Sequence, residues 1–577
     1  MRYFERVPAI TEKLGQWRSV LPFFKPYYRS ALASFGLMML SAALSLVMPF
    51  VTGRTIDAII AHDLSHVARL VIIAVVASAI LGSTGFLQGY FTAVVTRGFG
   101  RDLSLYMFKL LGTAKLDFFF DMAPGQIANR IGADVDYIAT VVYNTVFPSV
   151  AAFAMIVFTT GAMLASNWQL CLVSLITLPP WLVASQPGNE KRAELQRRMM
   201  AAMDLHNNIV NERLSLNGIV RRKTLLGHVE DTVVYSGVRN ELFNVNKLLV
   251  NVTGINSISV GFAASLGPAA VLLFGSWLAA HGRITVGLLA AFLALQSRMY
   301  QPLMSLFTIR LQMPQLWVRM ERVSSVIDAP QETDGKSDLE AKEGSLAFES
   351  LTIVRAKHEV LSRLSVTIKR GEHVAIIGRS GAGKTTMLHA ILKICLPASG
   401  SITINGKSLV DLRTDSVRDF VTYVPQEIDL LGHSVRANLC YGLIPKPSDE
   451  KVWDALRAVG MEQRVRRLPE ELSMPLSPNG STLSGGERQR LIIARGLLRH
   501  RPIYLFDEAT SDIDQISERQ VIAELRQRLS ASTILFVTHR LAAASTFDRI
   551  LYLSHGQITS ARSLSELEGD FPEVLLV

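Results

Sequence analysis

Long apolar stretches alternate with polar segments over the first 325 residues of the chain. Six stretches approach the ~20 residues that a helix needs to cross a bilayer. They cover residues 31–51, 70–93, 145–165, 170–185, 257–280 and 285–306. The fourth is short and contains Pro179-Pro180, so its ends are the hardest to define. Because soluble helical cores seldom repeat such runs, the pattern predicts six membrane-spanning helices.

The connections between these stretches differ in length and in charge. Residues 62–69, 167–169 and 281–283 are short connections, whereas residues 97–144 and 186–256 are long and rich in Lys and Arg. Lys and Arg accumulate in cytoplasmic loops. We therefore expect the two long loops, and with an even number of crossings both termini, on the cytoplasmic side of the inner (plasma) membrane.

The chain before the first stretch, residues 1–29, mixes charges with prolines and shows no secretory signal. Aromatic and basic side chains interleave in its second half, namely Trp17, Arg18, Phe23, Phe24, Lys25, Tyr27, Tyr28 and Arg29. This composition is typical of a helix that lies along the membrane interface. A simple membrane-proximal linker is the alternative.

The pattern changes after residue 327. Residues 328–343 are charged and lack periodicity, which predicts a linker. From residue 344 onward, short β-branched runs alternate with helical patterns, as in an α/β domain. We therefore expect a transmembrane domain at residues 1–327, with its two long cytoplasmic loops, and an α/β domain at residues 344–577.

Composition and charge agree with this division. The chain has 577 residues, of which 49% are hydrophobic and 19% charged, against about 25% charged residues in an ordinary soluble domain. Its 59 Lys and Arg exceed its 49 Asp and Glu, which gives a net charge of +10. Such a charge is compatible with nucleic acid or with an anionic membrane, but the basic loops account for it, and no nucleic-acid partner is expected. The 3 Cys are too far apart in sequence to indicate a disulfide or a zinc site.

The first chemical motif follows an apolar run that ends at Gly378. The next residues read GRSGAGKT, between a predicted strand and a helical pattern, which is the context of a phosphate-binding P-loop. Its backbone N–H groups surround phosphates, and the helix N-terminus favours their negative charge. Lys384 is expected to reach the β- and γ-phosphates of ATP, and Thr385 to bind Mg²⁺. The predicted ATP-binding residues here are Gly378, Arg379, Ser380, Gly381, Ala382, Gly383, Lys384, Thr385 and Thr386.

Two acidic residues, Asp507 and Glu508, end a second apolar run at residues 503–506. Phosphoryl transfer requires a carboxylate that holds the metal and a group that orients the attacking water. Asp507 is predicted for the first role and Glu508 for the second. An acidic pair at a strand end also has a purely structural interpretation, and the presence of the P-loop favours the chemical one.

A third motif lies between these two. Ser484, Gly485, Gly486 and Glu487 stand at the start of a helical run, where a hydroxyl and bare amides offer a second cradle for an anion. With its neighbours (LSGGERQR), this motif resembles the signature of ATP-binding-cassette transporters. The whole chain is similar to the exporter branch of that family in its half-transporter form. The resemblance implies a membrane α-helical domain of six helices fused to an α/β P-loop NTPase domain, here the nucleotide-binding domain at residues 344–577.

The resemblance implies roles for further residues. Gln426 matches the Q-loop, which senses the metal and contacts the membrane domain, and His539 matches the switch histidine that faces the γ-phosphate. Residues 511–514 match the D-loop. The two cytoplasmic loops of the membrane half, which carry coupling helices in the family, are echoed by Phe118, Phe119, Phe120, Asp121, Gly125, Gln126, Arg130, Asp134, Glu212, Gly218 and Glu230. Solvated helix extensions are the alternative for these loops.

Two positions depart from the family pattern. The aromatic residue that stacks on adenine in the family falls on Arg355 in this chain. Because a planar guanidinium stacks on a base as an aromatic ring does, Arg355 is expected to bind ATP, with His358 or plain surface placement as alternatives. Residues 474–480 lack the acidic residue that exporters carry before the signature, so coupling between subunits is expected to use other contacts.

The resemblance also implies a mechanism. Two chains would enclose two ATP molecules, each between the P-loop of one chain and the signature of the other, so that ATP shifts a two-state equilibrium toward the closed dimer. Because Glu508 and His539 are both present, a homodimer is favoured. The competent half of a heterodimeric exporter, paired with a related half-transporter, is one alternative. An ATP-gated regulator or channel on the same scaffold is the other.

One cation in the last apolar stretch bears on the substrate. Arg298 lies fifteen residues after Arg283, so a helix carries it about 22 Å from the external loop into a hydrocarbon core about 30 Å thick. An intramembrane Arg is by default a functional hypothesis. Arg298, Gln301 and Ser305 share a helical face and are predicted to line a substrate cavity, with structural pairing of Arg298 as the alternative. We therefore expect export of an amphipathic or acidic substrate, such as a peptide, a lipid or a siderophore-like molecule, by alternating access.

Overall fold

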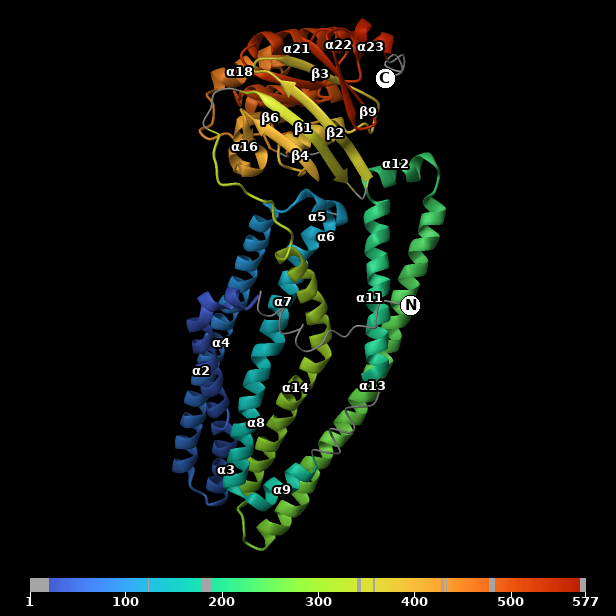
Figure 1. The fold of residues 1–577 in the computed structure, drawn as a ribbon. Coiled ribbons are helices and arrows are strands. Elements are labelled where there is room, and N and C mark those ends of the chain that lie inside the picture. The colour runs from blue at the N-terminus through green and yellow to red at the C-terminus, as the bar shows by residue number, and fades with distance from the viewer. Residues whose placement is uncertain are drawn as a thin grey trace. The chain divides into compact units, whose positions relative to one another are not determined.

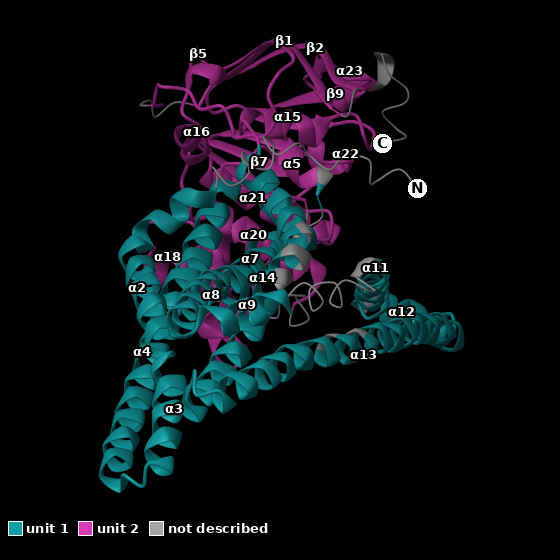
Figure 2. Cartoon of the chain, turned by 90° about the horizontal axis from the view of Figure 1, so that it is seen from below, with its two compact units in different colours: residues 1–112, 122–329 teal, residues 113–121, 330–577 magenta. Residues whose placement is uncertain are grey.

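A computed structural model describes residues 20–122, 124–177, 189–339, 344–355, 358–426, 430–431, 433–476 and 483–570. The chain divides into two compact units, shown in Figure 2. Unit 1 comprises Met1–Gly112 and Met122–Ala329, and unit 2 comprises Thr113–Asp121 and Pro330–Val577. A short piece of the N-terminal half of the sequence therefore packs with the C-terminal unit.

Unit 1 is helical throughout its described part (Figure 1). Its helices are η1 (Leu21–Tyr27), α2 (Tyr28–Leu44), α3 (Val47–Ile60), α4 (Leu64–Leu111), α6 (Pro124–Asn129), η2 (Arg130–Asp134), α7 (Val135–Val141), η3 (Val142–Val146), α8 (Phe147–Ser166), α9 (Trp168–Ile176), α11 (Asn189–Arg213), α12 (Leu216–Thr224), α13 (His228–Ala280) and α14 (Val286–Ile327). The elements η2 and η3 are π-helical turns within the stretch from α6 to α8.

Four stretches of the described residues are long and apolar enough to cross a membrane, namely Leu21–Ile60, Leu64–Leu111, Gly125–Ser166 and His228–Ala280. They contain the first, second, third and fifth predicted spans. The fourth begins as α9, and its remainder lies outside the described residues. The sixth falls in α14, which has 42 residues but is interrupted by polar side chains such as Arg298 and Gln301.

Polar contacts between neighbouring helices hold unit 1 together. The Asp57 carboxylate of α3 accepts hydrogen bonds from the Gly287 N–H at 2.8 Å and from the Thr285 hydroxyl at 2.7 Å, and so caps the start of α14. The hydroxyls of Ser34 and Thr92 join α2 to α4 at 2.7 Å, and both side chains are buried. Paired hydroxyls of this kind satisfy polar groups that hydrocarbon cannot.

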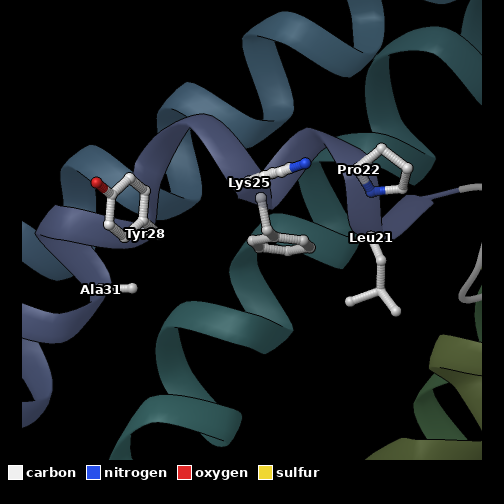
Figure 3. A pocket seen from close by; sticks show the side chains of 6 residues that line it. Leu21, Pro22, Lys25, Tyr28 and Ala31 are labelled. Carbon is white, nitrogen blue, oxygen red and sulfur yellow. The ribbon is translucent and has the colours of Figure 1, made fainter.

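The 3₁₀ helix η1 is fastened to α4 by aromatic contacts. Phe24 stacks on Phe99 with ring centroids 4.1 Å apart, and the Tyr27 hydroxyl donates to Asp102 at 2.7 Å. A Cβ on Gly98 would lie 2.3 Å from the Tyr27 ring, so only glycine permits this approach. Residues of η1 and of the start of α2, including Lys25 and Tyr28, line a shallow apolar pocket of about 560 Å³ (Figure 3). The segment predicted as an interfacial helix is thus helical from residue 20 onward.

Unit 2 is built on two sheets. A 4-stranded antiparallel sheet has the order β2-β1-β4-β5, and a 6-stranded sheet has the order β10-β9-β3-β8-β7-β6, in which all neighbours except β10 and β9 are parallel. The strands are β1 (Leu346–Arg355), β2 (His358–Ile368), β3 (His373–Ile377), β4 (Ser399–Ile404), β5 (Lys407–Ser408), β6 (Val421–Val424), β7 (Ile503–Asp507), β8 (Thr533–Val537), β9 (Arg549–Ser554) and β10 (Gln557–Ala561). The expected combination of a helical transmembrane domain with an α/β domain is confirmed.

Helices cover the sheets of unit 2. They are α5 (Leu116–Asp121), α15 (Lys384–Ile391), η4 (Leu409–Asp411), α16 (Thr414–Phe420), α17 (Val435–Leu439), α18 (Asp449–Ala458), α19 (Glu462–Arg466), η5 (Glu471–Ser473), α20 (Gly485–Leu497), α21 (Gln515–Arg528), α22 (Leu541–Ala544) and α23 (Leu564–Asp570). The central strands β3, β7 and β8 are buried at every position. In open parallel sheets, ligands bind beyond the carboxyl ends of such strands, and the predicted chemical residues follow these ends directly.

Candidate functional site

The P-loop forms the turn from β3 into α15. Gly383 is the N-cap of α15 with a φ of +102°, a left-handed conformation that favours glycine. A Cβ at this position would also lie 2.8 Å from the Leu361 side chain. Arg379 and Ser380 are exposed at the top of the loop, whereas Thr386 is buried at the base of the helix. The loop therefore has the backbone N–H groups and the helix N-terminus that an anion-binding loop requires.

Lys384 lies inside this loop with 7% of its surface exposed. Its ammonium donates to the Gly378 carbonyl at 2.6 Å and to the Arg379 carbonyl at 3.1 Å, and lies 3.8 Å from the Glu508 carboxylate. Burial lowers the pKa of the Lys384 ammonium, and the carboxylates of Glu508 and Asp507 offset part of this shift. The cation is thus held in position before any phosphate arrives.

Asp507, the last residue of β7, is 1% exposed. The Tyr423 hydroxyl donates to its Oδ2 at 3.0 Å, while its Oδ1 is buried and has no hydrogen-bond partner in the described part of the chain. Burial raises the pKa of Asp507, and nearby Thr385, Tyr423 and Lys384 counteract this shift. A buried carboxylate oxygen without a partner fits a bound cation, and Mg²⁺ is typically held by one or two protein oxygens together with phosphates and water. The residues present therefore fit Mg²⁺, with Asp507, Thr385 and Gln426 as the candidate ligands.

Glu508 is the meeting point of the other predicted residues. Its Oε2 accepts a hydrogen bond from the Gln426 amide at 2.9 Å and lies 3.6 Å from Nδ1 of His539. Its φ is +46°, which is uncommon for a residue with a side chain, and its N–H donates to the Val537 carbonyl at the end of β8. Three segments that are far apart in sequence thus converge on one carboxylate, which suits a group that orients water at a γ-phosphate.

The signature residues form the N-terminus of α20. Ser484 and Glu487 make a reciprocal capping box, in which the Glu487 N–H donates to the Ser484 hydroxyl and the Ser484 N–H donates to the Glu487 carboxylate. Arg464 donates a further hydrogen bond to Glu487 at 2.7 Å. The Gly485 and Gly486 amides lie at the helix start, the kind of position at which backbone N–H groups bind anions, and this position is distinct from the P-loop.

The D-loop is connected to both the signature helix and the switch segment. Gln489 of α20 donates to the Ser511 hydroxyl at 2.7 Å and accepts from the Asp512 N–H at 2.8 Å. Arg540, next to the switch histidine, donates to the carbonyls of Ser511 and Ile513 at 2.7 and 2.8 Å. These contacts make the signature, D-loop and switch segment of one chain a single hydrogen-bonded network.

Arg355 stands at the end of β1, where the sequence predicted a base-stacking residue. Its guanidinium lies over the ring of Phe120, a residue of α5, which is part of unit 2. Burial lowers the pKa of His389, and Arg355 lies close enough to lower it further by a smaller amount. Of the residues expected in the two cytoplasmic loops, the phenylalanines of α5 therefore contribute directly to unit 2.

The three candidate substrate residues lie along α14 of unit 1. The Arg298 guanidinium is half-buried and donates to the Ser45 carbonyl, between α2 and α3, at 2.5 Å. Gln301 is exposed, and the Ser305 hydroxyl donates to the Gln301 carbonyl at 3.2 Å. The alternative of structural pairing is therefore supported in part, because the Arg298 guanidinium has a hydrogen-bond partner in the Ser45 carbonyl.

Sequence reasoning missed Tyr423, His389, Gln489 and Arg540, although each contacts a predicted site residue or its neighbour. The sequence gives only one indication that they belong to the site, namely that each lies within a few residues of a motif. Their partners are brought to them by the sheet order and by helix packing.

Comparison with known proteins agrees with this geometry. Residues 361–511 match the family model of the ABC transporter, and residues 31–303 match that of the ABC transporter transmembrane region. An ATP-dependent lipid A-core flippase of Bordetella avium (strain 197N) is 27% identical over 563 residues, which cover 96% of this chain and 94% of the relative. A protein of the same name from Burkholderia pseudomallei (strain K96243) is 29% identical over 499 residues, covering 84% and 81%.

A solved structure of a bacterial Atm1-family ABC exporter with ATP bound superimposes with a TM-score of 0.81 at 23% identity. The match covers 95% of this chain and 98% of the exporter chain. At this identity the likeness concerns the fold, and it extends over both units.

Proposed function

The chain belongs to the ABC transporter family, as an ATP-hydrolysing exporter of the inner membrane, and we propose that two copies of it move an acidic, lipid-like amphiphile out of the cytoplasmic leaflet. In this arrangement each ATP lies between the P-loop of one copy and the signature of the other. Both termini face the cytoplasm. The nucleotide-binding domain is assigned to residues 344–577, the linker to residues 328–343 and the transmembrane domain to residues 1–327.

The convergence of Gln426, His539 and Lys384 on Glu508 is the observation that carries the proposal for hydrolysis. The γ-phosphate and the attacking water would occupy the space that these side chains face. Lys384 binds phosphate charge, Glu508 orients the water, and His539 stabilises the terminal phosphate. Asp507, Thr385 and Gln426 would hold Mg²⁺, which would neutralise part of the phosphate charge.

The complete set of hydrolytic residues supports a homodimer. A chain that carries the P-loop lysine, the water-orienting carboxylate and the switch histidine needs no second, different chain to complete two working sites. Pairing with a related half-transporter is tested by expressing two differently tagged copies of this chain. Co-purification of both tags with ATPase activity supports the homodimer, and strict 1:1 recovery with another chain overturns it.

The substrate proposal is supported by Arg298 and by the relatives. Arg298 lies in the last apolar stretch, where a cation is costly unless it meets a partner, water or a ligand. It donates one N–H to the Ser45 carbonyl, and a guanidinium has five N–H donors, so further donors are available for an anionic group. The curated relatives are lipid A-core flippases by name, which favours a lipid over a peptide or a siderophore-like molecule.

ATPase stimulation in nanodiscs tests this choice. The full-length protein is assayed with a lipid A-type glycolipid, an anionic phospholipid, an acidic peptide and a neutral amphiphile as matched control. We expect several-fold stimulation by the acidic lipids and none by the neutral amphiphile. Stimulation by the peptide alone, or equally by all four, would contradict the proposal.

A further inference from the structure

Three elements of unit 2 meet beside Asp507. Tyr423 lies on β6, which pairs in parallel with β7 so that Tyr423 is opposite Leu505 and Asp507 follows two residues later. Its hydroxyl reaches Oδ2 of Asp507 at 3.0 Å and Nε2 of His389 at 3.3 Å. His389 lies on α15, one helical turn after Thr385, and therefore on the same face of that helix. The Tyr423 hydroxyl thus connects the helix that carries Thr385 with the strand that carries Asp507.

The direction of each hydrogen bond follows from proton counting. A carboxylate that binds metal is ionised and only accepts, so the single proton of the Tyr423 hydroxyl is donated to Asp507. A phenol, whose ordinary pKa is about 10, keeps its proton at neutral pH. The contact with His389 must then be an Nε2–H donated to the phenol oxygen.

This assignment agrees with the surroundings of His389. Its Nδ1 is buried without a hydrogen-bond partner among the described residues, as expected for the bare nitrogen of a neutral imidazole. Burial and, to a smaller extent, Arg355 lower the pKa of His389, which favours the neutral form. The neutral tautomer of His389 that carries its proton on Nε2 is therefore consistent both with the contact to Tyr423 and with the unpartnered Nδ1.

We propose that Tyr423 and His389 are positioning residues, which hold the Asp507 carboxylate with Oδ1 directed to the metal that accompanies ATP. The proposal rests on the proposed use of Mg²⁺ by this site. The terminal torsion of an Asp side chain is broad and roughly two-fold. A hydrogen bond to Oδ2 removes that freedom and leaves Oδ1, the oxygen without a partner, for the cation. Groups that orient metal ligands typically change metal affinity 10–100-fold when they are removed.

Metal affinity is measured directly, apart from turnover. Full-length protein carrying Glu508→Gln, which blocks hydrolysis, is placed in nanodiscs and saturated with ATP, and free Mn²⁺ is titrated by EPR. On this background, Tyr423→Phe is expected to raise the Mn²⁺ dissociation constant about 10-fold. His389→Leu is expected to raise it by a smaller factor, and His389→Gln, which retains an N–H donor, to recover most of the loss.

Two controls separate positioning from general damage. Tyr441→Phe removes a phenol that is 57% exposed, outside the site, and should leave Mn²⁺ binding unchanged. Binding of a fluorescent ATP analogue in EDTA should be the same in all variants. With Glu508 intact, Tyr423→Phe should raise the Mg²⁺ concentration for half-maximal ATPase and regain most of kcat at saturating Mg²⁺.

The outcomes separate failure of the positioning role from failure of the metal site itself. If Tyr423→Phe binds Mn²⁺ as tightly as its parent, or loses metal-free ATP binding to the same extent, the positioning role is overturned while the metal site stands. If the parent itself binds no Mn²⁺ in the presence of ATP beyond what ATP alone holds in solution, the metal assignment fails, and the positioning role fails with it.

Discussion

The guanidinium of Arg355 lies over the ring of Phe120, with its central carbon 4.5 Å from the ring centroid. Contacts of this kind contribute about 0.5–1 kcal/mol at exposed sites, and Phe120 is 65% exposed. Arg355 ends β1 of unit 2, and Phe120 comes from α5, more than 200 residues earlier in the chain. Because a guanidinium is planar, an aromatic ring on one face leaves the other face for a second ring.

This arrangement sharpens the expectation that Arg355 stacks on adenine. Arg355→Ala should raise the KM for ATP several-fold, and Arg355→Tyr should restore it, since base stacking contributes about 1–3 kcal/mol in nucleic-acid complexes. The measurement is steady-state ATPase activity in nanodiscs over a range of ATP concentrations. Arg363→Ala, on the neighbouring strand β2, is the matched control. An unchanged KM in Arg355→Ala would exclude the base contact.

Glu508→Gln separates ATP binding from hydrolysis. The carboxylate orients water, whereas binding depends on Lys384 and on the P-loop amides. We expect the turnover to fall at least 100-fold, with ATP binding retained and the closed dimer accumulating. The readouts are phosphate release and binding of a fluorescent ATP analogue. Turnover at the parent rate would remove Glu508 from this role.

Arg298 is tested by comparing two substitutions. Arg298→Ala should abolish stimulation of the ATPase by acidic lipids, and Arg298→Lys should retain part of it, with the basal rate unchanged in both. The reason is that Lys preserves the charge but not the planar arrangement of five N–H donors of a guanidinium. Because Arg298 also donates to the Ser45 carbonyl, thermal stability is recorded in parallel. Equal stimulation in all three proteins would show that no anionic group is bound there.

Removal of Arg319 should destabilise unit 1. Arg319 pairs with Asp134 at 2.5 Å and lies over the Tyr137 ring at 4.2 Å. The Asp134 side chain is only 4% exposed, so Arg319→Met leaves a buried carboxylate without its partner, which typically costs about 3–5 kcal/mol. The apparent Tm in nanodiscs should drop. The double variant Arg319→Met/Asp134→Asn should recover most of it, and equal Tm values for single and double variants would argue against this pair.

The positions of the candidate site residues were largely predictable because these residues follow strand ends. The P-loop, Asp507 and Glu508 each come directly after a buried apolar run, and carboxyl ends of neighbouring parallel strands meet at one edge of a sheet. Their local sequence therefore fixes both their residue type and their place. The match of Gln426 and His539 to family motifs supplied the two remaining contacts of Glu508.

Tyr423 and His389 were not predictable as site residues, because their contacts join segments that are far apart in sequence. Tyr423 reaches Asp507, 84 residues away in sequence, only because β6 pairs with β7, and His389 reaches Tyr423, 34 residues away, only because α15 packs beside these strands. Likewise, the hydrophobic pattern assigns α5 to a long polar loop of the membrane half, and nothing in that pattern specifies that Phe120 packs on Arg355. Such pairs depend on tertiary arrangement, which hydrophobic periodicity does not encode.

Translocation of lipid in proteoliposomes tests ATP-driven export most directly. Protein is reconstituted with a fluorescently labelled anionic lipid, ATP and Mg²⁺ are added to outward-facing nucleotide-binding domains, and protection of the label from an impermeant quencher is followed. The parent protein should move the label to the inner leaflet only with ATP, and Glu508→Gln should not move it. Equal movement with and without ATP, or by Glu508→Gln at the parent rate, would contradict ATP-driven lipid export.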